Sequence, residues 1–164
     1  MIDVLVIGTG EYVTGLSGSK TTSSDKDLGV VALCLFDLRL RGFINRITLC
    51  GRNPKRQASV LNHIQHGIGS RFRDLDLGFD YHPSSGDQPD PTSYLKAMQN
   101  LRPGSAVIVV TPDDTHFDIA KAALEHGHHI LVAKPLVKTV FEHKKLIDLA
   151  ANRGLLGMVE FHKR

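Results

Sequence analysis

The position of Lys134 in the sequence indicates a catalytic or binding role more strongly than that of an ordinary surface lysine. It stands between the apolar run His129–Ala133 and Pro135. An ammonium group at the end of a buried strand can orient a hydroxyl or carbonyl group and pass a proton. A second polar turn, after the apolar run 106–111, carries Thr111, Pro112, Asp113 and His116. If both runs are strands of one parallel sheet, both turns lie at carboxyl ends, where open α/β sheets bind ligands.

The first apolar run, Ile2–Ile7, leads into a turn with two glycines. The turn residues are Gly8, Thr9, Gly10, Glu11 and Tyr12. Dinucleotide-binding sheets use such glycines to turn sharply and to bring the backbone close to a pyrophosphate. The third glycine of that pattern would fall at Val13, so an ordinary strand-to-loop turn is the alternative. A triphosphatase phosphate loop is rejected, because Leu16 stands where its lysine must be.

The end of the second apolar run, Ile44–Cys50, bears on which dinucleotide would bind. A carboxylate there accepts hydrogen bonds from the ribose of NAD, whereas this chain has Arg52 and Asn53. A guanidinium can form charge-assisted bonds to a 2′-phosphate. We therefore expect NADP in preference to NAD. The alternative is that Arg52 is a solvated loop residue and Asn53 only a helix N-cap.

Short apolar runs alternate with helical patterns along the chain, which predicts βαβ units and a parallel sheet. Strands are expected at Ile2–Ile7, Ile44–Cys50, 79–82, 106–111, His129–Ala133 and 156–161. Helices are expected to begin at Asn53, Asp90, Thr115 and Thr139 and to end near 67, 103, 125 and 154. The polar segment 14–27 is expected to be a flexible loop that could cover a cofactor, followed by a helix from Ser24 to Gly42.

Composition excludes several classes of protein. The 164 residues carry 20 Lys and Arg against 17 Asp and Glu, a net charge of +3 without a basic block, so no nucleic-acid partner is expected. No apolar run approaches the ~18 residues of a membrane span, and no signal peptide is recognisable. Cys34 and Cys50 lie in apolar runs and are expected to be buried free thiols in a reducing, cytoplasmic setting. We find no metal-binding cluster and no GxSxG turn.

These motifs together resemble the N-terminal half of the glucose–fructose oxidoreductase / inositol dehydrogenase / rhizopine-catabolism (Gfo/Idh/MocA) family. The matching pieces are VIGTG, TPDDTH, AKP and the closing VEFHKR. The family's usual Glu-Lys-Pro has Ala133 in the Glu position here, and Asp113 replaces the usual Asn. Within the family, GTGEYVTG, TPDDTHF and EFHKR are most similar to the D-galacturonate reductase-like branch.

The resemblance implies a Rossmann-type, doubly wound sheet over 1–164, with helices on both faces. It also implies an NAD(P)-dependent oxidoreductase that transfers a hydride to or from a small-molecule sugar or sugar acid. Lys134 would be the catalytic residue beside the nicotinamide, with Pro135 next to it. Thr111, Pro112, Asp113 and His116 would line the nicotinamide side, and His162 resembles a family position near the domain junction.

Family members continue into a second, α+β substrate domain, which this sequence does not contain. The chain is therefore interpreted as a truncated piece, a fragment or a free-standing cofactor domain. We expect it to bind cofactor with little or no turnover, because the substrate pocket would not exclude water. An open edge at the final strand makes a homo-oligomer plausible. The main alternative is a non-catalytic nucleotide-binding module; a methyltransferase is less favoured, because no acid follows the second strand.

Overall fold

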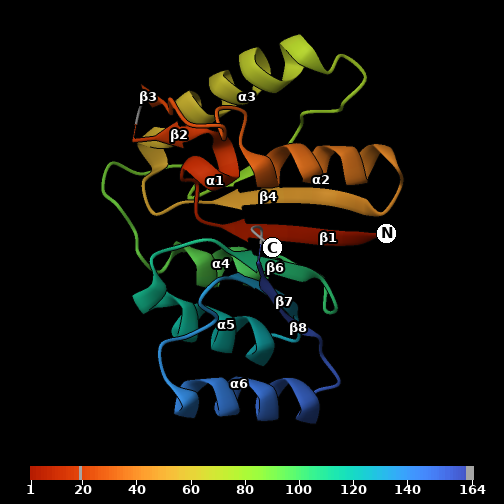
Figure 1. Ribbon diagram of the computed structural model, residues 1–164, viewed down its shortest axis with the longest axis vertical. Coiled ribbons are helices and arrows are strands. Elements are labelled where there is room, and N and C mark those ends of the chain that lie inside the picture. The colour runs from red at the N-terminus through yellow and green to blue at the C-terminus, as the bar shows by residue number, and fades with distance from the viewer. Residues whose placement is uncertain (19, 162–164) are drawn as a thin grey trace.

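Six strands form one parallel sheet in the order β5-β4-β1-β6-β7-β8 (Figure 1), which confirms the predicted α/β fold class. The computed structural model describes residues 1–18 and 20–161. The strands are β1 (Ile2–Ile7), β4 (Ile44–Cys50), β5 (Asp80–His82), β6 (Ala106–Val109), β7 (His129–Ala133) and β8 (Gly157–Glu160). The order reverses direction between β1 and β6, so the sheet has its topological switch point there.

Helices cover both faces of the sheet. They are α1 (Glu11–Thr14), α2 (Val30–Leu40), α3 (Gln57–Arg71), α4 (Ser93–Gln99), α5 (His116–Glu125) and α6 (Val140–Asn152). Side chains of β1 alternate between two cores: Val4 and Val6 pack with α2 and α3, and Leu5 and Ile7 pack with α4 and α5. Figure 1 shows α2 and α3 on one side of the sheet and α5 and α6 on the other. In the described part of the chain, no helix is long and apolar enough to cross a membrane.

Two helix starts follow the sequence signals. The Asn53 side chain accepts a hydrogen bond from the Lys55 amide, and Pro54 opens a short 3₁₀ turn, Pro54–Arg56, that leads into α3. Thr139 and Glu142 form the predicted capping box at the start of α6. In both places the cap satisfies backbone N–H groups that the first helical turn leaves without partners. The turn that precedes α3 thereby fixes where the chain leaves β4.

The helix predicted from Ser24 instead begins at Val30, which corrects the sequence interpretation. Gly29 has φ 77°, a conformation that a right-handed helix does not contain. A Cβ at Gly29 would lie 2.4 Å from the Val13 carbonyl oxygen, so tight packing on α1 imposes this backbone. The Ser24 hydroxyl donates to the Glu11 carboxylate instead of capping a helix.

Another expected boundary that fails is the end of α3, which passes through Gly67 and continues to Arg71. A glycine inside a helix costs only about 1 kcal/mol relative to alanine, so it does not by itself end one. Here a Cβ at position 67 would come within 3.3 Å of Leu28, which indicates that the glycine makes room for a neighbouring segment. Similarly, Asp90 caps the turn before α4 through Thr92, and the helix begins at Ser93.

The polar segment 14–27, expected to be a flexible loop, contains short pieces of regular structure in its described residues. It contains the antiparallel strands β2 (Leu16–Ser17) and β3 (Lys20–Thr21). His63 of α3 lies with its Nε2 2.7 Å from the Asp27 carbonyl oxygen, and Arg71 pairs with the Asp27 carboxylate at 3.2 Å. The C-terminal end of this segment is therefore attached to α3.

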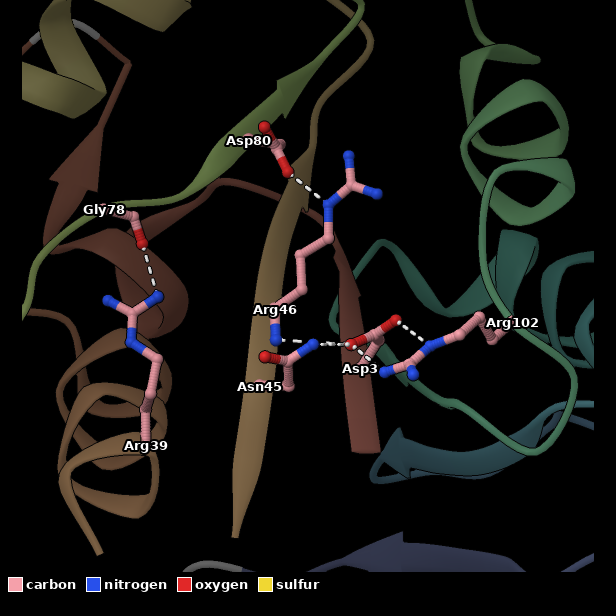
Figure 2. Close-up of polar contacts among 7 residues, drawn as sticks. All are labelled: Asp3, Arg39, Asn45, Arg46, Gly78, Asp80 and Arg102. Carbon is pink, nitrogen blue, oxygen red and sulfur yellow. Dashed lines mark hydrogen bonds and ion pairs between the residues drawn. The ribbon is translucent and has the colours of Figure 1, made fainter. Parts of the chain in front are cut away.

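The strands begin at one end of the sheet, which is called its amino edge here, and end at the other, its carboxyl edge. At the amino edge, the buried carboxylate of Asp3 binds two neighbouring segments together (Figure 2). Asp3 is 5% exposed and accepts hydrogen bonds from Arg102 at 2.8 and 2.9 Å and from the Asn45 amide group at 3.0 Å. The backbone N–H of Arg46 donates to the same carboxylate at 3.3 Å. The hydrogen bonds from Arg102 lower the pKa of Asp3. A charged residue inside β1 is thus tolerated because all its contacts are donors.

Candidate functional site

A cleft of about 510 Å³ lies at the carboxyl ends of β1, β4 and β6. This is the switch point of the sheet, where the connections from β1 and β6 leave toward opposite faces. The sequence-predicted residues that line it are Gly8, Thr9, Gly10, Arg52, Asn53, Thr111 and Pro112. Residues from three segments far apart in the sequence therefore meet at one place. The volume is that of a site for a small molecule or a cofactor.

Glycine is present at two positions of the first turn for different structural reasons. Gly8 has φ 111°, and a Cβ there would lie 1.9 Å from the Val110 carbonyl oxygen, so the close approach of β1 to the end of β6 requires glycine. A Cβ at Gly10 would meet no protein atom within 4 Å. Gly10 lines the cleft, so the missing side chain leaves backbone accessible to a ligand. This is a property that close binding of a phosphate needs.

The position expected for a third glycine is filled by Val13, which is fully buried between α1 and α2. The α1 helix has only four residues, and its C-terminal Gly15 ends it in a left-handed conformation. Glu11 points to the 22–24 segment, where hydrogen bonds from Ser24 lower the pKa of its carboxyl group. Glu11 therefore contacts the polar segment rather than the cleft, although the sequence placed it among the cofactor residues.

Two arginines stand at the end of β4, and both line the cleft. Arg52 is exposed, and its guanidinium forms no hydrogen bond or ion pair with any described residue, whereas its backbone carbonyl accepts a hydrogen bond from the Asp90 N–H at 2.7 Å. Arg56, which the sequence analysis did not single out, donates from a terminal guanidinium nitrogen to the Thr9 carbonyl oxygen at 3.0 Å. Its Nε is buried and has no partner in the described part of the chain. Among the described lining residues there is no carboxylate, so this end of the cleft favours an anion.

The base of the cleft is neutral. Cys50 lies at the end of β4 with its Sγ 3.5 Å from the Ser93 hydroxyl, and burial raises the pKa of the Cys50 thiol to about 11. Tyr94 also lines the cleft, and the Tyr81 hydroxyl donates to the Asn53 carbonyl oxygen at 3.4 Å. The described residues contain no cluster of three or more potential metal ligands. The polar groups of the cleft are therefore hydroxyls, backbone amides and guanidinium groups.

On the other side of the cleft, Thr111 and Pro112 line the wall and His116 lies behind them. The Thr115 hydroxyl is 2.7 Å from both the Thr111 hydroxyl and the Pro112 carbonyl oxygen, which closes the turn. The His116 ring is 1% exposed, with its nitrogens near the Thr111 and Pro135 carbonyl oxygens. Asp113 is exposed at the start of the same turn and does not line the cleft.

Lys134 and Pro135 follow β7 directly, at the same edge of the sheet, and both lie outside the residues that line the cleft. Lys134 is exposed and makes no hydrogen bond or ion pair within the described residues. Its neighbour Ala133 pairs in register with Glu160 of β8, so a carboxylate lies on the adjacent strand. The sequence analysis did not identify Glu160, because nothing local in the sequence indicates which residue lies opposite Ala133.

Tyr12 connects the first turn to that carboxylate. Its hydroxyl donates to Glu160 Oε1 at 3.0 Å, across 148 residues of sequence. Burial and the contact with Glu160 raise the pKa of Tyr12 to about 12. Since β6 and β7 lie between β1 and β8, this side chain spans the ends of two strands. His162, which the sequence placed near the domain junction, lies outside the described residues.

Comparison with known proteins agrees with this geometry. Residues 2–161 match the family model described as the oxidoreductase family with an NAD-binding Rossmann fold, Gfo/Idh/MocA, and the chain belongs to this family. It is 45% identical over 58 residues to the uncharacterized oxidoreductase YdgJ of Escherichia coli (strain K12), covering 35% of this chain and 16% of that protein. The chain therefore belongs to the family although Asp113 and Ala133 replace the usual Asn and Glu of its motifs.

Two further similar proteins show how much of a relative's length this chain covers. It is 40% identical over 58 residues to levoglucosan dehydrogenase of Pseudarthrobacter phenanthrenivorans, covering 35% of this chain and 15% of that protein. The structure of biliverdin reductase from Synechocystis sp. PCC 6803, in complex with biliverdin and NADP⁺, superimposes with a TM-score of 0.60 at 21% identity. That match covers 97% of this chain and 37% of the other, so the likeness is one of fold over the nucleotide-binding part.

Proposed function

We propose that the chain is the NADP-binding part of an oxidoreductase that moves a hydride between a nicotinamide and a sugar or sugar acid. The observation that carries this proposal is the cleft itself, in which Gly10 leaves the backbone open and two arginines stand without an acid. A pyrophosphate fits the open backbone, and a 2′-phosphate fits the arginine end. The absence of a carboxylate at the end of β4 supports NADP over NAD.

The chain's own residues would divide the work along the cleft. Arg52 and Arg56 would bind the 2′-phosphate, because both line the cleft and no carboxylate lines it beside them. The turn at Gly10 would hold the pyrophosphate. Thr111 and Pro112 would support the nicotinamide ribose. The bound nicotinamide supplies or accepts the hydride.

We propose that Lys134 contacts the substrate oxygen at which the reaction takes place. An exposed ammonium group at the end of β7, without an internal counter-charge among the described residues, can hold a substrate hydroxyl or polarise a carbonyl. One matched relative is named as a levoglucosan dehydrogenase, which supports a sugar-type substrate. The TPDDTHF and EFHKR motifs support the narrower proposal of a D-galacturonate-like sugar acid. Cys50 is a buried free thiol as expected, whereas Cys34 is exposed, and two free cysteines fit a cytoplasmic location.

A specific observation favours the second candidate, a module that binds the dinucleotide without turnover. The groups proposed to bind the cofactor line the cleft, whereas Lys134 lies outside it. The chain also covers only 37% of the biliverdin reductase chain that it resembles, so a complete substrate pocket would require further structure. Binding without measurable turnover by this chain alone is expected under both candidates.

Fluorescence titration with NADPH and NADH tests the proposal. The wild-type chain should bind NADPH more tightly than NADH, because only NADPH contacts both arginines. Arg52→Ala and Arg56→Ala should each weaken NADPH binding by about tenfold or more, since a charge-assisted hydrogen bond contributes about 1.5–3 kcal/mol. Lys55→Ala is the matched control, because Lys55 lies between them in sequence but does not line the cleft. Equal affinity for the two cofactors would contradict the NADP assignment, and absence of binding would contradict the function.

A further inference from the structure

His116 lies at the junction of the two turns that follow β6 and β7. Its ring is 1% exposed. Its Nδ1 is 2.8 Å from the Pro135 carbonyl oxygen, and its Nε2 is 2.9 Å from the Thr111 carbonyl oxygen. Both distances are those of N–H···O hydrogen bonds. One side chain thus contacts a residue that lines the cleft and the residue that follows Lys134.

The two contacts have a chemical requirement, because carbonyl oxygens only accept hydrogen bonds. A neutral imidazole has one N–H and can satisfy one of them, whereas the imidazolium form has two. The charged groups on the segments that meet at His116 are Asp113, Asp114, Asp118, Lys134 and Lys138. Among the described residues none of these hydrogen-bonds the ring, and Lys138 and Asp114 pair with each other. The ring is therefore oriented by the two backbone carbonyls.

We propose that His116 is a positioning residue, whose ring contacts the Pro135 and Thr111 carbonyl oxygens and thereby fixes the Lys134 turn relative to the Thr111 wall of the cleft. This inference rests on the proposed function, since the Thr111 side is where the nicotinamide end of the dinucleotide would lie. It differs from the sequence-based expectation, in which His116 itself lines the nicotinamide site. A buried ring behind the wall acts through the turns that it joins.

The position of His116 separates its effect from that of the arginines. Arg52 and Arg56 stand at the end of β4, and His116 contacts the turns after β6 and β7. Adenosine 2′,5′-bisphosphate carries the 2′-phosphate but has no nicotinamide half. Loss of the His116 contacts should therefore weaken binding of NADP⁺ and leave binding of adenosine 2′,5′-bisphosphate unchanged. A general loosening of the fold would weaken both.

The experiment compares the whole chain with His116→Phe, His116→Gln and the control Lys138→Met. The Phe variant keeps the volume and removes both ring nitrogens, the Gln variant keeps one donor group, and the control removes the exposed ion pair between the same two segments. Calorimetric titration should show NADP⁺ affinity reduced by about fivefold or more in the Phe variant, the effect of one or more lost hydrogen bonds. The Gln variant should recover part of it, and the control should match the wild type.

Nitrogen-15 spectra of the His116 ring in the wild-type chain at neutral pH provide the second readout, which requires no variant to fold. A hydrogen-bonded ring N–H is expected, and a ring without any hydrogen-bonded N–H would overturn the proposal. An equal loss of affinity for NADP⁺ and adenosine 2′,5′-bisphosphate in the variants would overturn it as well. If the wild-type chain binds neither ligand, the proposed function fails; if it binds both and His116→Phe changes neither, only this inference fails.

Discussion

The amino and carboxyl edges of the parallel sheet both carry charged side chains, but these side chains are paired differently. At the amino edge, Asp3 is bound by Arg102, and Arg46 pairs with Asp80 (Figure 2). At the carboxyl edge, Arg52 and Lys134 have no ion-pair partner among the described residues, and no acid lines the cleft. The cleft thus differs from the amino edge in that no carboxylate among its lining residues balances its arginines.

A second hollow, at the amino edge, shows the same difference when it is compared with the cleft. The hollow at the amino edge has a volume of about 420 Å³ and contains Arg39 and Arg46. Arg39 donates to the Gly78 carbonyl oxygen at 2.8 Å and also pairs with Asp76. Both Arg39 and Arg56 leave a buried Nε without a partner, so that feature alone does not distinguish the edges. Arg56 lacks a carboxylate partner among the described residues, and this leaves its charge available to a ligand.

The largest effect is expected from giving the carboxyl edge the internal pairing of the amino edge. Arg52→Asp places a carboxylate near Arg56 and opposes a 2′-phosphate. Like charges brought together at a binding surface cost several kcal/mol, so NADPH affinity should fall by about a hundredfold. NADH, which lacks that phosphate, should bind as well as before or better. Parallel titrations measure both, and a similar loss for NADH would show that Arg52 does not contact the 2′ position.

At the amino edge, Asp3→Ala should lower the free energy of unfolding without changing NADPH affinity. The substitution removes the hydrogen bonds of a buried carboxylate, worth about 2 kcal/mol. Asp80→Ala is the control, because its half-exposed ion pair with Arg46 should contribute less than about 1 kcal/mol. Urea unfolding measures the difference. A change of NADPH affinity in Asp3→Ala would contradict the separation of a stabilising amino edge from a binding carboxyl edge, since the two edges would then be coupled.

The same residue predicts a pH dependence of stability. The folded-state pKa of Asp3 is lowered, chiefly by Arg102, so its contribution is present above its ordinary value and is lost as pH falls. From about pH 4 downward, near the ordinary pKa of an aspartate, the wild type should lose free energy of unfolding that Asp3→Asn does not lose. Urea titrations at a series of acidic pH values test this. Parallel pH profiles for the two proteins would contradict the assignment.

The smallest effect is expected at Tyr12. Tyr12→Phe removes the hydroxyl that donates to Glu160 and should lower the free energy of unfolding by about 1 kcal/mol. NADPH affinity should change little, because neither residue lines the cleft. Tyr81→Phe, whose hydroxyl contact with Asn53 is longer at 3.4 Å, should change stability less. A larger loss of NADPH binding than of stability would place Tyr12 at the cofactor, as the sequence predicted.

Sequence reasoning succeeded where a strand end determines the position of a residue. Gly8, Gly10 and Arg52 follow directly from strands that an apolar run identifies, so their meeting at one edge of the sheet was predictable. Arg56 was missed because its contact with Thr9 joins residues 47 apart, and Asp3 with Arg102 joins residues 99 apart. The start of α2 was misplaced because packing on Val13 imposes the backbone of Gly29. Such contacts depend on tertiary structure and leave no local pattern.

The placement of aromatic rings around the cleft has an optical consequence. The chain has no tryptophan and three tyrosines. Tyr94 lines the cleft, Tyr81 donates to Asn53 in its wall, and Tyr12 follows the glycine turn. Without tryptophan, the tyrosine emission of this chain comes from these three rings, of which Tyr94 lines the cleft. A ligand that enters the cleft changes the surroundings of Tyr94, so the unlabelled chain reports its own occupancy.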